Sequence, residues 1–198
     1  NAGSVDEPPG AYCQARSKIP QPLLDQALAA TAKSAEHKAC LSRALHGRPV
    51  KVLDGTTARL TDTPPNRQAF APSKSLPKGT GFPVLKIAVL FSLASGAVLA
   101  RATGNLMMHD ARLCQALRAS FLKGDIIVAD RAYAIFSVLA WLQSLGLDLI
   151  ARVPTRARRV DFRRTHKRHA HGDALFKWQK PPKPSAFLPQ AEWLALPK

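Results

Sequence analysis

Two short apolar runs, each closed by an aspartate, place the strongest constraint on how this chain folds. Residues 50–53 lead to Asp54 and residues 126–129 lead to Asp130, and both runs are typical of strands. Ligands of open α/β sheets gather at the carboxyl ends of the strands, so two such strands side by side would bring both carboxylates into one crevice. Paired carboxylates there suit Mg²⁺ and phosphoryl transfer. The alternative is that each aspartate only starts a turn or caps a helix.

The order of the other predicted elements indicates an α/β fold. Apolar runs on both sides of Ser95-Gly96 predict an antiparallel hairpin over residues 84–101, and the segment 61–82, rich in proline, serine and glycine, predicts a loop. A mixed sheet with helices packed on its faces satisfies this order. The remaining expected elements are a helical segment over 21–46, a helix that His109 or Asp110 caps and Gly124 closes, a helix over 135–145 that Gly146 ends, and a strand over 147–153.

The charge of the chain favours a polyanionic partner. Its 198 residues carry 29 Lys and Arg against 13 Asp and Glu, a net charge of +16, and the hydrophobic share of 46% is that of a folded protein. Nucleic acid would relieve the self-repulsion, because its phosphates reward Lys and Arg through counterion release. The alternative is a basic protein without such a partner. The apolar runs are too short for a membrane-spanning helix, and we expect no membrane partner.

The cysteines and the glycines exclude several kinds of site. Cys13, Cys40 and Cys114 lie far apart without a CxxC motif, so we expect three buried, reduced thiols in a cytosolic protein. There is no glycine-rich loop of the P-loop kind, so ATP is not implied.

A basic segment follows Pro154. We expect it to bind the DNA backbone, and the alternative is that it forms only a solvated basic hairpin. Arg131 and Tyr133 follow Asp130 and could contact a phosphate. The alternative is that Arg131 pairs with a nearby carboxylate and Tyr133 only packs. Trp178 either stacks on a base or packs within a small core, and His166, His169 and His171 favour surface positions over a metal cluster. The candidate DNA-binding residues are Arg131, Arg156, Arg158, Arg159, Arg163, Arg164, Lys167 and Arg168.

Several segments resemble the transposases of the insertion-sequence-four group, from about residue 10 to the end. They are GAYCQARSKIP, VKVLDGTTARLTDTP, GFPVLKIAVLFSLASGAVL and GDIIVADRAYAIFSVLAWLQSLGLDLIARV. The DGT at Asp54 and the ADRAY at Asp130 are specific in combination. The resemblance implies a ribonuclease H-like fold and a DDE triad whose first two members match Asp54 and Asp130. It also implies two Mg²⁺ ions, which Mn²⁺ can replace, with transposon inverted repeats and target DNA as partners, a homodimer in the synaptic complex, and a cytoplasmic, nucleoid-associated location.

The sequence departs from the family at its end. The third acid of the family belongs to a Tyr-Arg-Glu-Lys signature after a β-rich insertion, and neither Glu7 nor Glu192 has that context. We therefore expect a fragment, truncated at both ends and inactive alone. Its expected parts are an N-terminal helical segment (1–47), the first part of a ribonuclease H-like catalytic core (48–155) and a partial basic β insertion (156–198). The alternatives are a non-catalytic DNA-binding remnant of a decayed element and a metal-dependent, structure-specific nuclease of the same fold.

Overall fold

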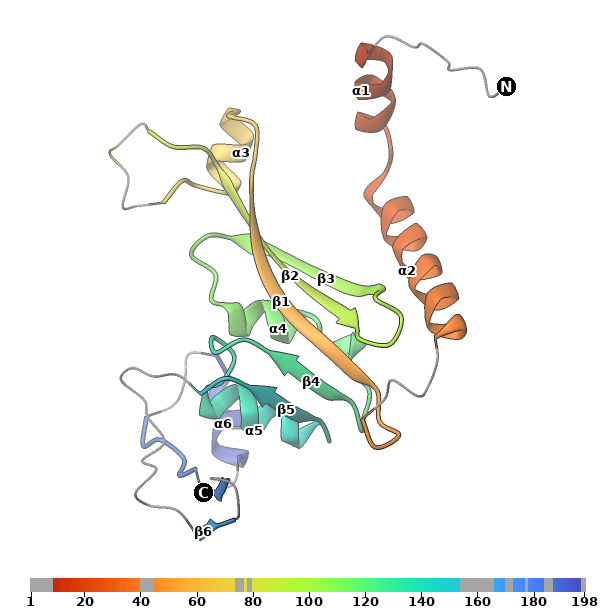
Figure 1. Ribbon diagram of the computed structural model, residues 1–198. Coiled ribbons are helices and arrows are strands. Elements are labelled where there is room, and N and C mark those ends of the chain that lie inside the picture. Colours follow the sequence, from red (N-terminus) through yellow and green to blue (C-terminus); the bar gives the residue numbers. More distant parts are fainter. Residues whose placement is uncertain are drawn as a thin grey trace.

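A five-stranded mixed sheet forms the centre of the computed structural model (Figure 1). Its strands follow the order β3-β2-β1-β4-β5. They are β1 (Val50–Arg59), β2 (Val84–Ser92), β3 (Val98–Asn105), β4 (Ile126–Ala129) and β5 (Asp148–Ala151). The structure describes residues 9–39, 45–73, 77, 80–153, 166–169, 173–176, 178–183 and 187–196.

The pairing of the strands confirms the predicted α/β fold class. β1, β2 and β3 are antiparallel, and Gly96, with a φ of 70°, allows the tight turn of the predicted β2–β3 hairpin. β4 pairs with the other edge of β1, and β5 pairs with β4; both pairs are parallel, and a helix precedes each of the two strands, as parallel connections require. The sheet is therefore mixed.

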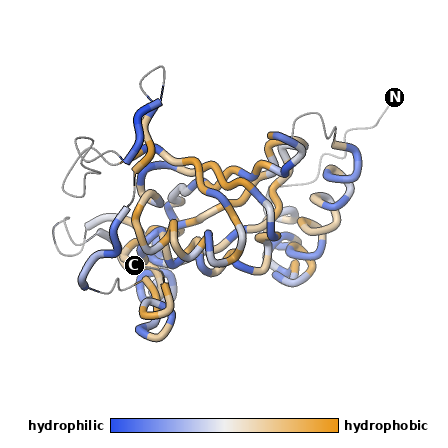
Figure 2. Tube along the Cα trace, turned by 90° about the horizontal axis from the view of Figure 1, so that it is seen from below, coloured by the Kyte–Doolittle hydropathy of each residue, from blue (hydrophilic) through white to orange (hydrophobic). Residues whose placement is uncertain are grey.

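Apolar side chains on one face of the sheet form the core. Leu53, Leu90 and Ile127 come from three neighbouring strands and are at most 1% exposed. The helices α4 (Asp110–Ala116), α5 (Phe136–Ser144) and α6 (Gln190–Ala195) add buried residues to the same cluster, as does the short 3-10 helix η2 (Arg118–Ser120) through the flanking Leu117. Figure 2 shows the hydrophobic residues concentrated in these central elements.

The C-terminal part of the described chain packs on this core. Trp193 of α6 lies edge-to-face on Phe136 of α5, with 5.9 Å between the ring centroids, and Phe187 packs in the same way on Trp141 at 5.6 Å. Residues 187–196 therefore cover α5 directly. In Figure 1, α5 and α6 lie together at the lower left.

The remaining elements lie around the sheet. α1 (Pro9–Ser17) and α2 (Gln21–Lys38) are on the right in Figure 1, where Asp25 of α2 forms an ion pair with Arg101 of β3. Because side chains alternate along a strand, Arg101 points away from the face on which Ala102 is buried, so α2 lies on the face opposite the core helices. The smallest elements are α3 (Pro64–Ala69) and the paired strands β6 (Lys167–Arg168) and β7 (Ala174–Leu175).

Four expectations about segments outside the two aspartate-bearing strands are wrong. Residues 61–82 contain α3, because Thr63 accepts a hydrogen bond from Asn66 N and Pro64 suits a first helical turn. The helical segment does not reach residue 46, since α2 ends at Lys38 and Leu45 forms a bridge with Arg48. α4 ends at Ala116, well before Gly124, although His109 caps it as expected.

The fourth error concerns the thiols. Cys114 is buried as expected, but Cys13 is exposed on α1. Cys40 lies outside the described residues.

Candidate functional site

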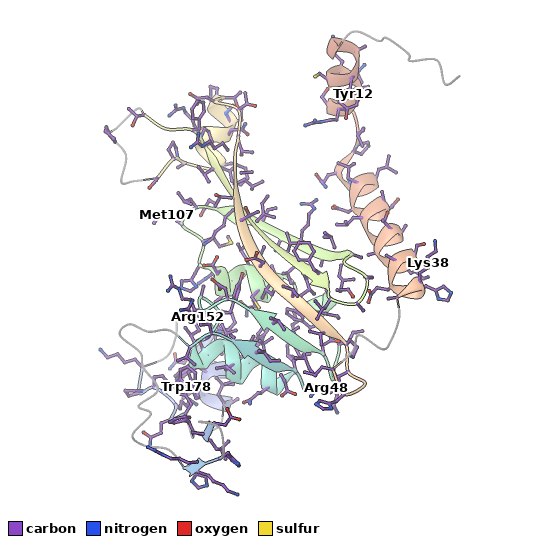
Figure 3. All side chains as sticks on the ribbon, viewed as in Figure 1. Tyr12, Lys38, Arg48, Met107, Arg152 and Trp178 are labelled. Carbon is purple, nitrogen blue, oxygen red and sulfur yellow. The ribbon has the colours of Figure 1, made fainter. Side chains whose placement is uncertain are left out.

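The register of the parallel strands places Asp54 and Asp130 in one row. Leu53 of β1 pairs with Ala129 of β4, and Ala129 pairs with Ala151 of β5. The next residues along the three strands are Asp54, Asp130 and Arg152. This pairing shows that the two aspartate-bearing strands are neighbours. Neighbouring strands lie about 4.8 Å apart. Arg152, labelled in Figure 3, is exposed where the parallel strands finish.

Asp54 does not end its strand, which corrects the sequence analysis. β1 continues to Arg59 because β2 pairs with it along its whole length, from Lys51↔Ser92 to Arg59↔Val84. What ends at this point is β4, so from Asp54 onward β1 has an open edge on that side. The polar residues after Asp54 gave no strand signal, since they are exposed.

Backbone N–H groups orient one oxygen of each carboxylate. Gly55 N donates to Asp54 Oδ1 at 2.8 Å, and Ala132 N donates to Asp130 Oδ1 at 2.8 Å. Within the described residues, the second oxygen of each aspartate has no hydrogen-bond partner. Both side chains are exposed, so these oxygens remain available to a ligand.

A cleft of about 410 Å³ lies along the open edge of β1. Because β4 no longer covers this edge, groups from both faces of the sheet reach the cleft. Its lining is Asp54, Gly55, Thr56, Thr57, Lys86, Asp110, Asp130, Ala132 and Tyr133. Three carboxylates thus face one cleft with a single lysine, in a chain that is strongly basic overall.

The sequence analysis missed Lys86 and Asp110 as members of this cleft. Lys86 Nζ lies 2.8 Å from Asp110 Oδ1, and their side chains are 19% and 27% exposed. Lys86 stands within an apolar strand and Asp110 was expected only as a helix cap, so neither carried a signal for a site. The cap is instead the ring nitrogen Nδ1 of His109, which accepts from Ala111 N and leaves the Asp110 carboxylate to the cleft.

Tyr133 is a buried side chain with a polar end at the cleft. It is 2% exposed, and among the described residues its hydroxyl has no hydrogen-bond partner. Burial, followed by the charges of Asp110, Cys114, Asp130 and Asp54, raises the pKa of this hydroxyl far above its usual range. It therefore keeps its proton at neutral pH and is available as a donor. The ring of Tyr133 is packed in the core, and a contact of its hydroxyl with a phosphate stays a prediction.

The other predicted site residues lie away from the cleft or outside the described residues. Arg131 is exposed and does not line the cleft. Lys167 and Arg168 are exposed on β6, as are His166 and His169 beside it. Trp178, labelled in Figure 3, is half-buried. The residues outside the described ranges are Arg156, Arg158, Arg159, Arg163, Arg164 and His171.

A comparison with protein families decides what kind of domain carries this cleft. A family model described as the transposase DDE domain matches residues 45–196. The chain belongs to this transposase family. The match includes all five strands of the sheet and α6, and the mixed sheet flanked by helices is consistent with the ribonuclease H-like domain of DDE transposases. No curated protein matches the chain.

The transposase family makes a divalent cation relevant, and the donor set of the cleft fits one. Asp54 and Asp130 offer exposed carboxylate oxygens, the ligands that Mg²⁺ prefers. In the described ranges, no three acidic, histidine or cysteine side chains are gathered closely enough to hold one ion together. Nor does any helix in those ranges have the length and apolar character needed to span a membrane.

Proposed function

We propose that this transposase catalyses metal-dependent DNA strand cleavage and strand transfer, with Asp54 and Asp130 holding the catalytic cations. The observation that carries the proposal is the strand register, in which the two aspartates follow the paired residues Leu53 and Ala129. By resemblance, its DNA substrates are the ends of an insertion sequence and the target. Membership of the insertion-sequence-four group, with a homodimer in the synaptic complex, is part of the same proposal.

The two aspartates suit Mg²⁺, or Mn²⁺ in its place. The Oδ1 atoms are tied to backbone N–H groups, so the carboxylates keep their orientation while the other oxygens bind a cation. When bound, two such ions would polarise the attacking oxygen and stabilise the leaving oxygen of a phosphodiester. The chain itself orients the carboxylates through these backbone donors.

Exposed basic side chains outside the cleft would position the DNA. Arg152 follows β5 in the same row as the aspartates, and Arg131 directly follows Asp130. Lys167 and Arg168 are exposed on β6. Contacts of arginine and lysine with phosphates fix the register of DNA on a protein without reading its sequence. The third acid of the triad and the division into a core (48–155) and a basic insertion (156–198) stay predictions.

Cation binding by the purified chain tests this proposal. We expect Mn²⁺ to bind in isothermal titration calorimetry, and Asp54→Asn or Asp130→Asn to weaken binding by about tenfold or more, because each removes a charged ligand. Asp173→Asn changes the same charge at an exposed position next to β7 and should bind like wild type. A wild-type chain that binds no Mn²⁺, or aspartate variants that bind as well as wild type, would reject the assignment.

Strand cleavage separates the proposed transposase from its alternatives. We expect the full-length protein that the gene encodes to nick DNA with transposon ends only when Mg²⁺ or Mn²⁺ is present. The Asp54→Asn variant should not nick this DNA. DNA binding without any cation-dependent nicking would instead support a non-catalytic remnant. Cutting that does not depend on inverted repeats would support a structure-specific nuclease.

A further inference from the structure

Lys86 is the one cation among the described residues that line the cleft. It pairs with Thr57 across the antiparallel strands β1 and β2, and paired residues of neighbouring strands share a face of the sheet. Three carboxylates line the same cleft, so a phosphate that enters it meets negative charge unless a cation offsets it. The ammonium group of Lys86 is therefore the group of the cleft that a phosphate oxygen would approach.

Two acceptors hold this ammonium group in place. Lys86 Nζ lies 2.8 Å from Asp110 Oδ1 and donates to Met108 O at 3.0 Å. The side chains of Lys86 and Asp110 are 19% and 27% exposed, so solvent reaches the ion pair. The pair is not needed to hold α4 on the sheet, because Leu113 and Cys114 of this helix are buried in the core. A phosphate can thus replace Asp110 while Met108 O keeps the ammonium group at the cleft.

A second partner for Asp110 lies close to it. The hydroxyl of Tyr133 is shielded from solvent and has no hydrogen-bond partner among the described residues. A Cβ atom at position 55 would lie 3.7 Å from Tyr133 Oη and 3.9 Å from Asp110 Oδ1, so both oxygens border the small space that Gly55 leaves open. A buried donor without a partner costs free energy, which a carboxylate that turns toward it would recover.

We propose that Lys86 binds a DNA phosphate in the cleft, and that Asp110 then passes from the lysine to the hydroxyl of Tyr133. This inference rests on the proposed function, because it presumes that DNA enters this cleft. Without DNA, the ion pair neutralises the charge of the lysine. With DNA, a phosphate oxygen takes the place of the carboxylate on Nζ, and the Tyr133 hydroxyl donates to Asp110. Every group keeps its proton, so only hydrogen bonds are exchanged.

Binding of a duplex oligonucleotide in the presence of EDTA tests the role of Lys86 without divalent cations. Lys86→Met should weaken binding and lower its salt dependence by about one counterion. Lys33→Met removes an exposed lysine of α2 and serves as the control for net charge, with a smaller expected effect. The inference is overturned if Lys86→Met binds no more weakly than Lys33→Met, or if the wild-type chain does not bind the duplex.

Tyr133→Phe tests the exchange, because it removes only the hydroxyl. It should weaken binding of the duplex by about tenfold, since Asp110 loses its second partner. In the Asp110→Ala background the same change should have little effect, because no carboxylate remains to receive the hydrogen bond. Urea unfolding of the DNA-free chain should show that Tyr133→Phe is at least as stable as wild type, as expected for a hydroxyl without a partner there.

Two results of this cycle would contradict the exchange. A Tyr133→Phe variant that binds the duplex like wild type would show that the hydroxyl has no part in DNA binding. An equal loss of affinity in both backgrounds would show that the hydroxyl contacts DNA directly and that Asp110 does not pass to it.

Mn²⁺ calorimetry separates this inference from the proposed function. If Asp54→Asn weakens Mn²⁺ binding while Lys86→Met binds the duplex like wild type, the inference is wrong and the proposed function stands. If the wild-type chain binds no Mn²⁺ while Lys86→Met weakens duplex binding, the proposed metal site fails and the phosphate contact of Lys86 is supported. Thermal unfolding of each variant shows whether it remains folded.

Discussion

Lys51 and Asp125 form an ion pair at the start of the two strands that lead to Asp54 and Asp130. Lys51 Nζ lies 2.6 Å from Asp125 Oδ2, and the two side chains are 7% and 1% exposed. Lys51 also donates to Ser120 O at 2.9 Å, and Leu122 N donates to Asp125 Oδ2 at 2.7 Å. The pair joins the start of β1 to the residue before β4, and thus supports the two strands that carry Asp54 and Asp130.

Removing the lysine should be far more costly than removing an exposed partner elsewhere. Lys51→Met keeps most of the apolar stem but leaves Asp125 as a buried carboxylate with only a backbone donor, and breaking such a buried pair costs about 3–5 kcal/mol. The exposed pair of Arg48 and Asp148, with side chains 38% and 57% exposed, provides the comparison. Asp148→Asn should cost no more than about 1 kcal/mol.

Urea unfolding of the variants measures these differences. We expect Lys51→Met with Asp125→Asn to be more stable than Lys51→Met alone, because the second change neutralises the unpaired charge. A loss below about 1 kcal/mol for Lys51→Met, or a double variant less stable than the single one, would refute the reasoning.

Two further predictions concern the thiol in the core and the arginine in the row. Burial raises the pKa of Cys114 from 9.0 to about 12, so the folded state holds a proton that the unfolded state loses in this range. The free energy of unfolding of the wild type should therefore fall by about 1 kcal/mol relative to Cys114→Ala between pH 8 and pH 10, and a constant difference would contradict this. Arg152→Gln should weaken DNA binding and lower its salt dependence by about one counterion. An equal effect of Lys33→Gln on α2 would mean that only net charge matters.

The sequence was most informative where burial and periodicity acted together. The apolar runs before Asp54 and Asp130 are strands, the glycine turn at residue 96 joins a hairpin, and Gly146 ends α5 with a φ of 76°. These features can be predicted from a short window of sequence, because a buried strand needs apolar residues whichever segments pack against it. The adjacency of the two aspartate-bearing strands was a hypothesis at that stage, and the pairing of β1 with β4 shows it.

The parts that sequence reasoning missed depend on contacts between distant segments. Lys86 and Asp110 meet only because α4 packs against the β2–β3 hairpin. α6 is a short helix without a strong pattern, and its position is defined by Trp193 against α5. The exposed half of β1 is a strand because β2 pairs with it, although its polar residues predict none. Such features have no signal within a short window of sequence.

The common row of Asp54, Asp130 and Arg152 is fixed by the backbone ladder, and therefore depends on how many residues each strand contributes before it. Deleting one residue from the first half of β1 would shift Gly55 into the place of Asp54 and invert the inside and outside of the strand. Such a deletion would keep every acidic residue of the protein, yet Asp54 would no longer lie in the same row as Asp130. Among related genes, length changes in these short strands should accordingly be far rarer than substitutions.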